Sequence, residues 1–258
     1  MNTALILSAD SLLHGLWMAL RVGGLWMALP VFGSAVLPVR LRLLLTVACA
    51  LLLELALGAR VSMPPPGSPA FWLGALGEIA IGLLLGFVLR MAFEAMLLGA
   101  ELISLAMGLG FAQLNDPLRG TSAPVLGQVF TVLTTLIFFS LGGHLRLFEW
   151  LAWSYTATPA GGQGMLAWTL LEGSLAWSGW MFSHAVQVAA PALFALLIVN
   201  IGFGLISRAA PSLNLLAVGF PAALLLGLIL LTLMVPILAE QAEEAIAAGV
   251  GLIEALIQ

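Results

Sequence analysis

Long apolar segments constrain this chain more than any other feature of its sequence. Of its 258 residues, 62% are hydrophobic and 8% are charged, whereas about 25% of the residues in an average soluble domain are charged. Several apolar runs approach or exceed the length of about 18 residues that identifies a transmembrane candidate. The sequence therefore predicts an all-α, membrane-class fold of helical hairpins and long kinked helices.

Prolines and glycines divide the apolar runs into these helices. Residues 12–29 and 43–57 are predicted to form a helical hairpin, which the proline-rich stretch 64–69 separates from the rest. Residues 71–107 lack proline and would measure about 55 Å as one helix, against about 30 Å of hydrocarbon in a bilayer. We expect this run either to bend near Gly99 or to extend well beyond the membrane.

The second half of the chain is also predicted to be helical. Apolar helices are expected over 125–141, 145–153, 186–206 and 213–238, followed by an amphipathic tail at 239–258. Tryptophans within 165–180 favour an interface belt or a helix that packs on a partner. Kinks are expected at Pro191, Pro221 and Pro236, because proline removes a backbone donor from the helix.

Charged side chains interrupt the apolar runs at eight positions, namely Arg21, Glu54, Glu78, Arg90, Glu94, Glu101, Arg146 and Glu149. Each would cost about 2.5 to 3.5 kcal/mol at the centre of a lipid-exposed helix, so we expect them to face protein or water. At 100° per residue, Arg90, Glu94 and Glu101 lie within roughly 40° of one another and form a polar stripe.

On the same helix, Gly82 and Gly86 form a GxxxG step that lets a neighbouring helix approach closely. We interpret the polar stripe as an interhelical or intersubunit ion-pair set. Proton relay or substrate coupling is the alternative interpretation, because both kinds of site bury charge.

The sequence offers no enzyme signature. Neither G-x-S-x-G nor H-E-x-x-H occurs, the three histidines are far apart in the sequence, and the single cysteine, Cys49, excludes an internal disulfide. The net charge of −4 says little about nucleic acid, but the sequence has no basic cluster, and we expect no nucleic acid partner. The sequence therefore predicts a non-enzymatic protein with no metal site and no cofactor.

A polar loop between two apolar helices is the strongest candidate for the working part of the chain. Its sequence is MGLGFAQLNDPLRGTSAPVLGQ, from Met107 to Gln128, and it combines glycines with Asn-Asp-Pro turn chemistry. The candidate site residues in it are Gly108, Leu109, Gly110, Phe111, Ala112, Gln113, Leu114, Asn115, Asp116 and Pro117. A tight connecting turn with satisfied polar groups is the alternative.

The order and spacing of several short motifs closely resemble those of the FliR family of flagellar export-gate subunits, over about residues 10 to 240. The motifs are Pro30 with PVRLR at 38–42, the glycine and NDP loop at 108–120, LGGHL at 141–145, Asn200, RAAP at 208–211 including Arg208, and VGFP at 218–221. Ser212 departs from the pattern, which has glutamine before the Leu-Asn pair.

This resemblance implies a subunit of the type III export gate in the bacterial inner membrane, at the flagellar basal body. In that family one copy assembles with five FliP-type and four FliQ-type subunits beside a FlhB-type export protein, and unfolded flagellar proteins are the substrates. Residues 1–175 would be the FliP-like part and 176–258 a FliQ-like hairpin. The loop at 108–124 is similar to the family's plug, with Phe111 as the expected stopper.

Other functions are compatible with the same residues. A secondary transporter or channel subunit acting alone would also use interrupted helices and intramembrane charges, but it would favour paired repeats, and no internal repeat is evident in the sequence. A structural assembly nucleus that never touches substrate is a further alternative. Within the family, a virulence injectisome gate subunit shares the resemblance.

Overall fold

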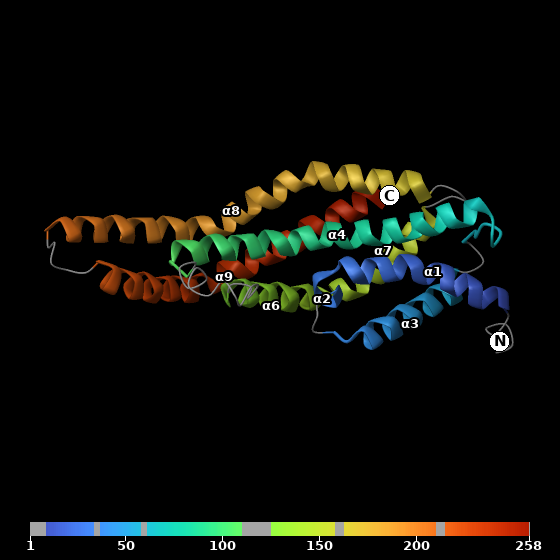
Figure 1. Cartoon of the computed structure of the whole chain (residues 1–258), viewed down its shortest axis with the longest axis horizontal. Helices are drawn as coiled ribbons and strands as arrows, with labels where there is room; N and C mark the ends of the chain where they lie inside the picture. Colours follow the sequence, from blue (N-terminus) through green and yellow to red (C-terminus); the bar gives the residue numbers. More distant parts are fainter. Residues whose placement is uncertain are drawn as a thin grey trace. The chain divides into compact units, whose positions relative to one another are not determined.

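The computed structural model describes residues 9–33, 37–57, 61–109, 125–157, 163–209 and 215–257, which form helices and their connecting turns and contain no strand. The all-α fold predicted from the sequence is confirmed. The helices are α1 (Ala9–Ala28), α2 (Pro30–Gly33), α3 (Val39–Leu57), α4 (Pro69–Ala106), α6 (Val125–Ser140), α7 (Gly143–Thr156), α8 (Gln163–Ala209) and α9 (Leu215–Ile257) (Figure 1).

Helix α4 is longer than a bilayer crossing requires. Its 38 residues would span about 57 Å at 1.5 Å per residue. The helix runs through Gly99 without a break, and a Cβ at Gly99 would lie 2.8 Å from Cγ1 of Val188 on α8. Gly99 is therefore a point of close helix packing, and the structure supports the long-helix alternative rather than an interruption at this residue.

Two helix predictions were wrong in their boundaries. Helix α8 is one element of 47 residues, although separate segments were expected at 165–180 and 186–206. The intervening sequence MFSHA contains no glycine or proline, so nothing ends the helix there. Helix α9 likewise continues to Ile257 and includes the predicted tail, because the acidic residues of the tail are compatible with a helix.

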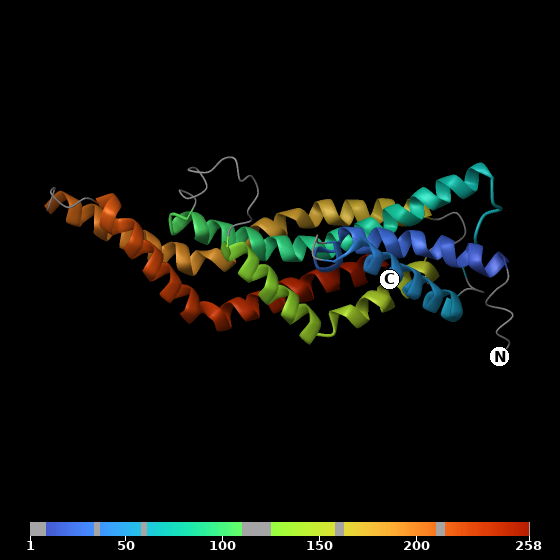
Figure 2. The same ribbon diagram turned by 60° about the horizontal axis from the view of Figure 1, so that its bottom comes forward.

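Prolines lie inside both long carboxy-terminal helices. Pro191 is within α8, and Pro221 and Pro236 are within α9. Figure 2 shows the ribbon of α9 as bent rather than straight. A bend is the expected consequence of the missing backbone donors and of the clash of the proline ring with the preceding turn.

The described helices contribute to two compact units. Unit 1 consists of residues 1–92, 139–178 and 247–258, and unit 2 of residues 93–138 and 179–246. In unit 1, α1 and α3 pack side by side, as both views show (Figures 1 and 2). The boundaries fall inside α4, α6, α8 and α9, and the proposed division at residue 175 also falls inside α8.

Among the described residues, three helices are long and apolar enough to cross a membrane: α4, residues 163–206 of α8 and residues 221–257 of α9. The bent pair of α6 and α7 would make a fourth crossing if it counts as one span. Large apolar side chains on these helices are exposed in the single chain, including Phe194 and Leu233, each 70% exposed. Such faces need lipid or other subunits to cover them.

Candidate functional site: buried charges and the end of α4

The close contact between α1 and α4 depends on glycines from both helices. A Cβ at Gly82 would overlap the backbone carbonyl oxygen of Arg21, and a Cβ at Gly86 would lie 2.8 Å from the carbonyl oxygen of Leu25. On α1, a Cβ at Gly24 would lie 2.7 Å from the carbonyl oxygen of Ile79. The GxxxG step of α4 thus meets the backbone of α1 directly.

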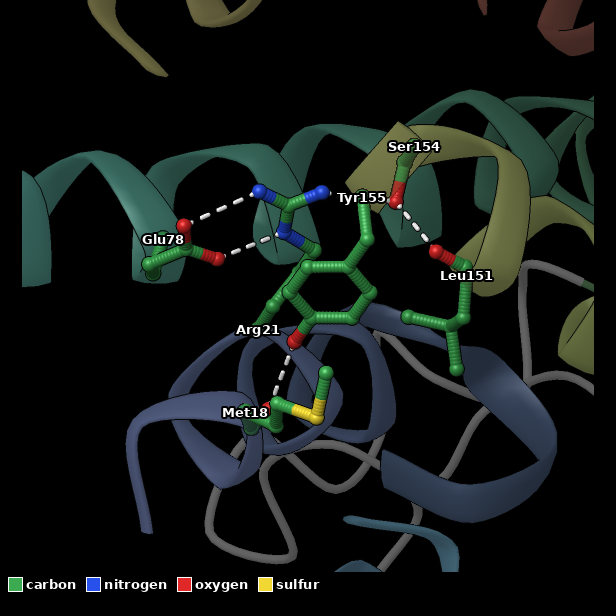
Figure 3. A network of polar contacts seen from close by, with 6 residues as sticks. All are labelled: Met18, Arg21, Glu78, Leu151, Ser154 and Tyr155. Atoms are coloured by element: carbon green, nitrogen blue, oxygen red, sulfur yellow. Dashed lines mark hydrogen bonds and ion pairs between the residues drawn. The ribbon is translucent and has the colours of Figure 1, made fainter. Parts of the chain in front are cut away.

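This close approach places Arg21 of α1 against Glu78 of α4. Nε of Arg21 donates to Oε2 of Glu78 at 2.7 Å, and Nη2 donates to Oε1 at 3.0 Å. The two side chains are 0% and 1% exposed. Two parallel hydrogen bonds between a guanidinium and a carboxylate combine strength with a fixed orientation (Figure 3).

Helix α7 completes the buried polar cluster, which consists of Arg21, Glu78, Ser154 and Tyr155. Nη1 of Arg21 donates to Oγ of Ser154 at 2.8 Å, and Cζ of Arg21 lies 3.9 Å from the centre of the Tyr155 ring. The hydroxyl of Tyr155 donates to the carbonyl oxygen of Met18 at 2.8 Å (Figure 3). A cation over an aromatic face is attracted by its quadrupole, so the ring adds to the binding of the guanidinium.

The buried polar cluster joins three helices that are far apart in the sequence. It is sealed, since all four side chains are buried, and each of them makes at least one hydrogen bond or ion pair. A sealed and satisfied ion pair has no access to a substrate. Its chemistry therefore suits the fixing of α1, α4 and α7 in unit 1.

Two further ion pairs account for other charges in the apolar runs. Nδ1 of His14 lies 2.8 Å from Glu54, and Nε2 lies 2.9 Å from the carbonyl oxygen of Val61. Nη1 of Arg146 on α7 donates to Glu254 near the end of α9 at 2.9 Å. Both pairs lie within unit 1. The expectation that charges in the apolar runs face protein or water thus holds for Glu54, which pairs with His14, and for Arg146, which pairs with Glu254.

The polar stripe on α4 lies apart from the buried polar cluster. Arg90 is exposed, and Glu94 and Glu101 are half-buried. Arg208 is exposed near the end of α8. In the part of the chain that the structure describes, no three His, Cys, Asp or Glu side chains are placed to hold a metal ion. Coverage of the stripe by neighbouring subunits is still a prediction.

Of the candidate loop at 107–128, residues 107–109 and 125–128 are described, and the latter form the start of α6. Gly108 and Leu109 are described, whereas Gly110, Phe111, Ala112, Gln113, Leu114, Asn115, Asp116 and Pro117 lie outside the described residues. Gly108 has a φ of 78°, and its N–H donates to the carbonyl oxygen of Leu105 at 3.0 Å. The N–H of Leu109 donates to the carbonyl oxygen of Ser104 at 3.0 Å. These two bonds with a left-handed glycine form a Schellman motif that ends α4.

Sequence reasoning missed the partners of Arg21. It identified Arg21 and Glu78 as charges that need protein or water, but it did not pair them and did not identify Ser154 or Tyr155. One signal was available: the two opposite charges both lie within apolar runs, and Glu78 is four positions, about one helical turn, before Gly82. Nothing local marks Ser154, which is 133 positions from Arg21.

Comparison with known proteins identifies the family. The model for "Bacterial export proteins, family 1" matches residues 12–249. The chain is 32% identical to flagellar biosynthetic protein FliR of Escherichia coli (strain K12), over 88% of this chain and 86% of that protein. It is 30% identical to FliR of Aquifex aeolicus (strain VF5), over 90% of this chain and 89% of that protein. The chain therefore belongs to the FliR family of bacterial export proteins and is a flagellar export subunit.

Proposed function

We propose that the chain is a non-enzymatic subunit of the flagellar type III export gate in the inner membrane. It assembles with FliP-type and FliQ-type subunits, beside a FlhB-type export protein, into a channel for unfolded flagellar proteins. The observation that carries this proposal is the family match, which extends over residues 12–249 and therefore over both compact units.

The exposed apolar faces support assembly with other subunits. On α8, Phe194, Leu197, Ile198, Ile201 and Leu205 are all more than 50% exposed in the single chain. On α4, Arg90 is exposed and Glu94 is half-buried on a helix longer than the hydrocarbon is thick. Lipid alone would cover the apolar side chains but would penalise the charges. Protein partners can cover both kinds of side chain.

The size of the purified complex tests the proposed assembly. We expect the tagged chain, co-expressed with its FliP-type and FliQ-type partners and extracted in detergent, to elute in a complex several-fold heavier than one chain. Native mass spectrometry identifies the subunits. A monomer or homo-oligomer obtained in the presence of both partners would contradict the proposal and would favour the transporter alternative.

The loop at 108–124 is proposed to act as the plug of this channel. Its first two residues, Gly108 and Leu109, close the Schellman motif that ends α4, and its glycines and apolar residues would allow a compact stopper. Phe111 and Leu114 are the proposed stoppers, because large apolar side chains exclude water and ions from a narrow lumen. The plug must block ions at rest and yield to a polypeptide during export.

Deletion of residues 110–115 is expected to make the assembled gate leak. Cells that express the complete gate with this deletion should take up ions faster than cells with the intact gate, because the apolar seal is lost. A conductance or swelling assay gives the rate. Replacement of Phe111 and Leu114 by serine keeps the loop length and should also increase the ion leak of the assembled gate. If the deletion variant assembles and its conductance equals that of the intact gate, the plug assignment is wrong.

A further inference from the structure

The last two turns of α4 bury one face in unit 2. Ala100, Ile103, Ser104 and Met107 recur at helical spacing and are all buried, whereas Leu105 on the opposite face is 65% exposed. Met107 is 2% exposed and is the last residue before the left-handed Gly108. The buried face of α4 therefore extends to the residue at which the helix ends.

Met107 fits against a glycine of α9. A Cβ at Gly227 would lie 2.5 Å from Cε, 2.6 Å from Cγ and 2.7 Å from Sδ of Met107. Such distances are shorter than real Cβ contacts, so any larger residue at 227 would displace Met107. The absence of a side chain at Gly227 is what makes room for Met107.

The backbone beside Met107 is also fixed. Hydrogen bonds from the N–H groups of Gly108 and Leu109 close the Schellman motif, and the positive φ at Gly108 suits glycine and disfavours other residues. Gly108 thus has a defined helix-ending conformation.

We propose that Met107 is a positioning residue, and that its contact with Gly227 fixes the end of α4 and hence the point from which the plug segment leaves the helix. This inference rests on the proposed function of residues 108–124. Met107 contacts α9 and directly precedes Gly108 and Leu109, so it would act on the plug segment through the backbone of these two residues.

The test exchanges volume between the two positions. Gly227→Leu should displace Met107 and raise the ion leak of the assembled gate by roughly fivefold or more, up to the level of the 110–115 deletion. Met107→Ala should also leak, because it empties the contact. The double variant, Met107→Ala with Gly227→Leu, should leak less than either single variant, because leucine then fills the space that methionine leaves.

Gly179→Leu on α8 is the matched control. Gly179 belongs to the same unit, a Cβ there would meet no heavy atom within 4 Å, and it lies outside the exposed apolar face at 194–205, so the gate with this variant should leak no more than the intact gate. If the gate with Gly227→Leu does not assemble, the ion leak and the amide exchange of Met107→Ala provide the test, because this variant only removes atoms. If the 110–115 deletion leaks, equal leak in Gly179→Leu and Gly227→Leu would overturn the positioning role.

Hydrogen exchange separates this inference from the plug assignment. The amides of Gly108 and Leu109 are hydrogen-bonded in the intact chain and should exchange faster in Gly227→Leu and in Met107→Ala. Unchanged exchange at both amides would overturn the inference, whatever the leak. Suppose that the two amides exchange faster in both variants but the 110–115 deletion does not leak. The positioning role of Met107 would then stand, and the plug assignment would be refuted. If the 110–115 deletion leaks but Gly227→Leu leaks no more than the intact gate, the positioning role of Met107 would be refuted and the plug assignment would stand.

Discussion

The Glu78→Ala variant is expected to lose about 3 to 5 kcal/mol of stability, because it leaves the guanidinium of Arg21 buried without its carboxylate partner. Arg21 is 0% exposed and lies at the contact of α1, α4 and α7. The buried guanidinium would then have neither water nor a counter-ion to stabilise its charge. The loss is a large fraction of the 5 to 15 kcal/mol that is typical of a folded domain.

The Arg146–Glu254 pair is the control, because it is also an arginine–glutamate ion pair but is much more exposed to solvent. Its side chains are 48% and 31% exposed, and their N–O distance of 2.9 Å is close to that of the buried pair. Solvent screens an exposed pair, so Glu254→Ala should cost only about 0 to 1 kcal/mol. Denaturant titration of the detergent-extracted protein, followed by tryptophan fluorescence, gives both values.

Removal of both charges separates the net contribution of the pair from the cost of an orphaned charge. Arg21→Met with Glu78→Leu should recover most of the stability that Glu78→Ala loses, because apolar side chains of similar size need no partner. Equal losses in Glu78→Ala and Glu254→Ala would show that burial does not decide the effect. A double variant no more stable than Glu78→Ala would point to the shape of the site instead of its charge.

The architecture could be predicted because it depends on local signals. Apolar runs predict helices, and prolines, glycines and turn residues end most of them near the observed positions, as at Leu57 and Val125. The continuity of α8 and α9 was missed because the prediction relied on the same local signals. A change from apolar to mixed composition resembles a boundary, although composition alone does not end a helix without a breaking residue.

The buried polar cluster could be predicted only in part, because its partners are set by packing. The sequence shows that Arg21 and Glu78 are unsuited to lipid, but they are 57 positions apart, and periodicity does not tell which helices meet. The polar stripe of Arg90, Glu94 and Glu101 differs in kind. In the single chain Arg90 is exposed and Glu94 and Glu101 are half-buried, and coverage of this stripe by other subunits stays a prediction.

Substitution of Gly82 by alanine is expected to have the second large effect on stability. It should destabilise the chain, although a change from glycine to alanine in a helix usually stabilises it. Alanine normally stabilises a helix relative to glycine by about 1 kcal/mol. At Gly82, however, the new methyl group would overlap the backbone carbonyl oxygen of Arg21. Backbone atoms cannot move aside as a flexible side chain can, so α1 and α4 must separate, and overpacking of this kind typically costs about 1 to 3 kcal/mol.

Gly251→Ala provides the matched comparison, because Gly251 lies in a helix of the same unit and a Cβ there would meet no heavy atom within 4 Å. It should stabilise the chain by about 0.5 to 1 kcal/mol, with the propensity of alanine unopposed. Separation of α1 from α4 also stretches the Arg21–Glu78 pair, so Gly82→Ala and Glu78→Ala should be less than additive when combined. Stabilisation by Gly82→Ala, or simple additivity of the two changes, would show that the glycine contact does not hold the ion pair in place.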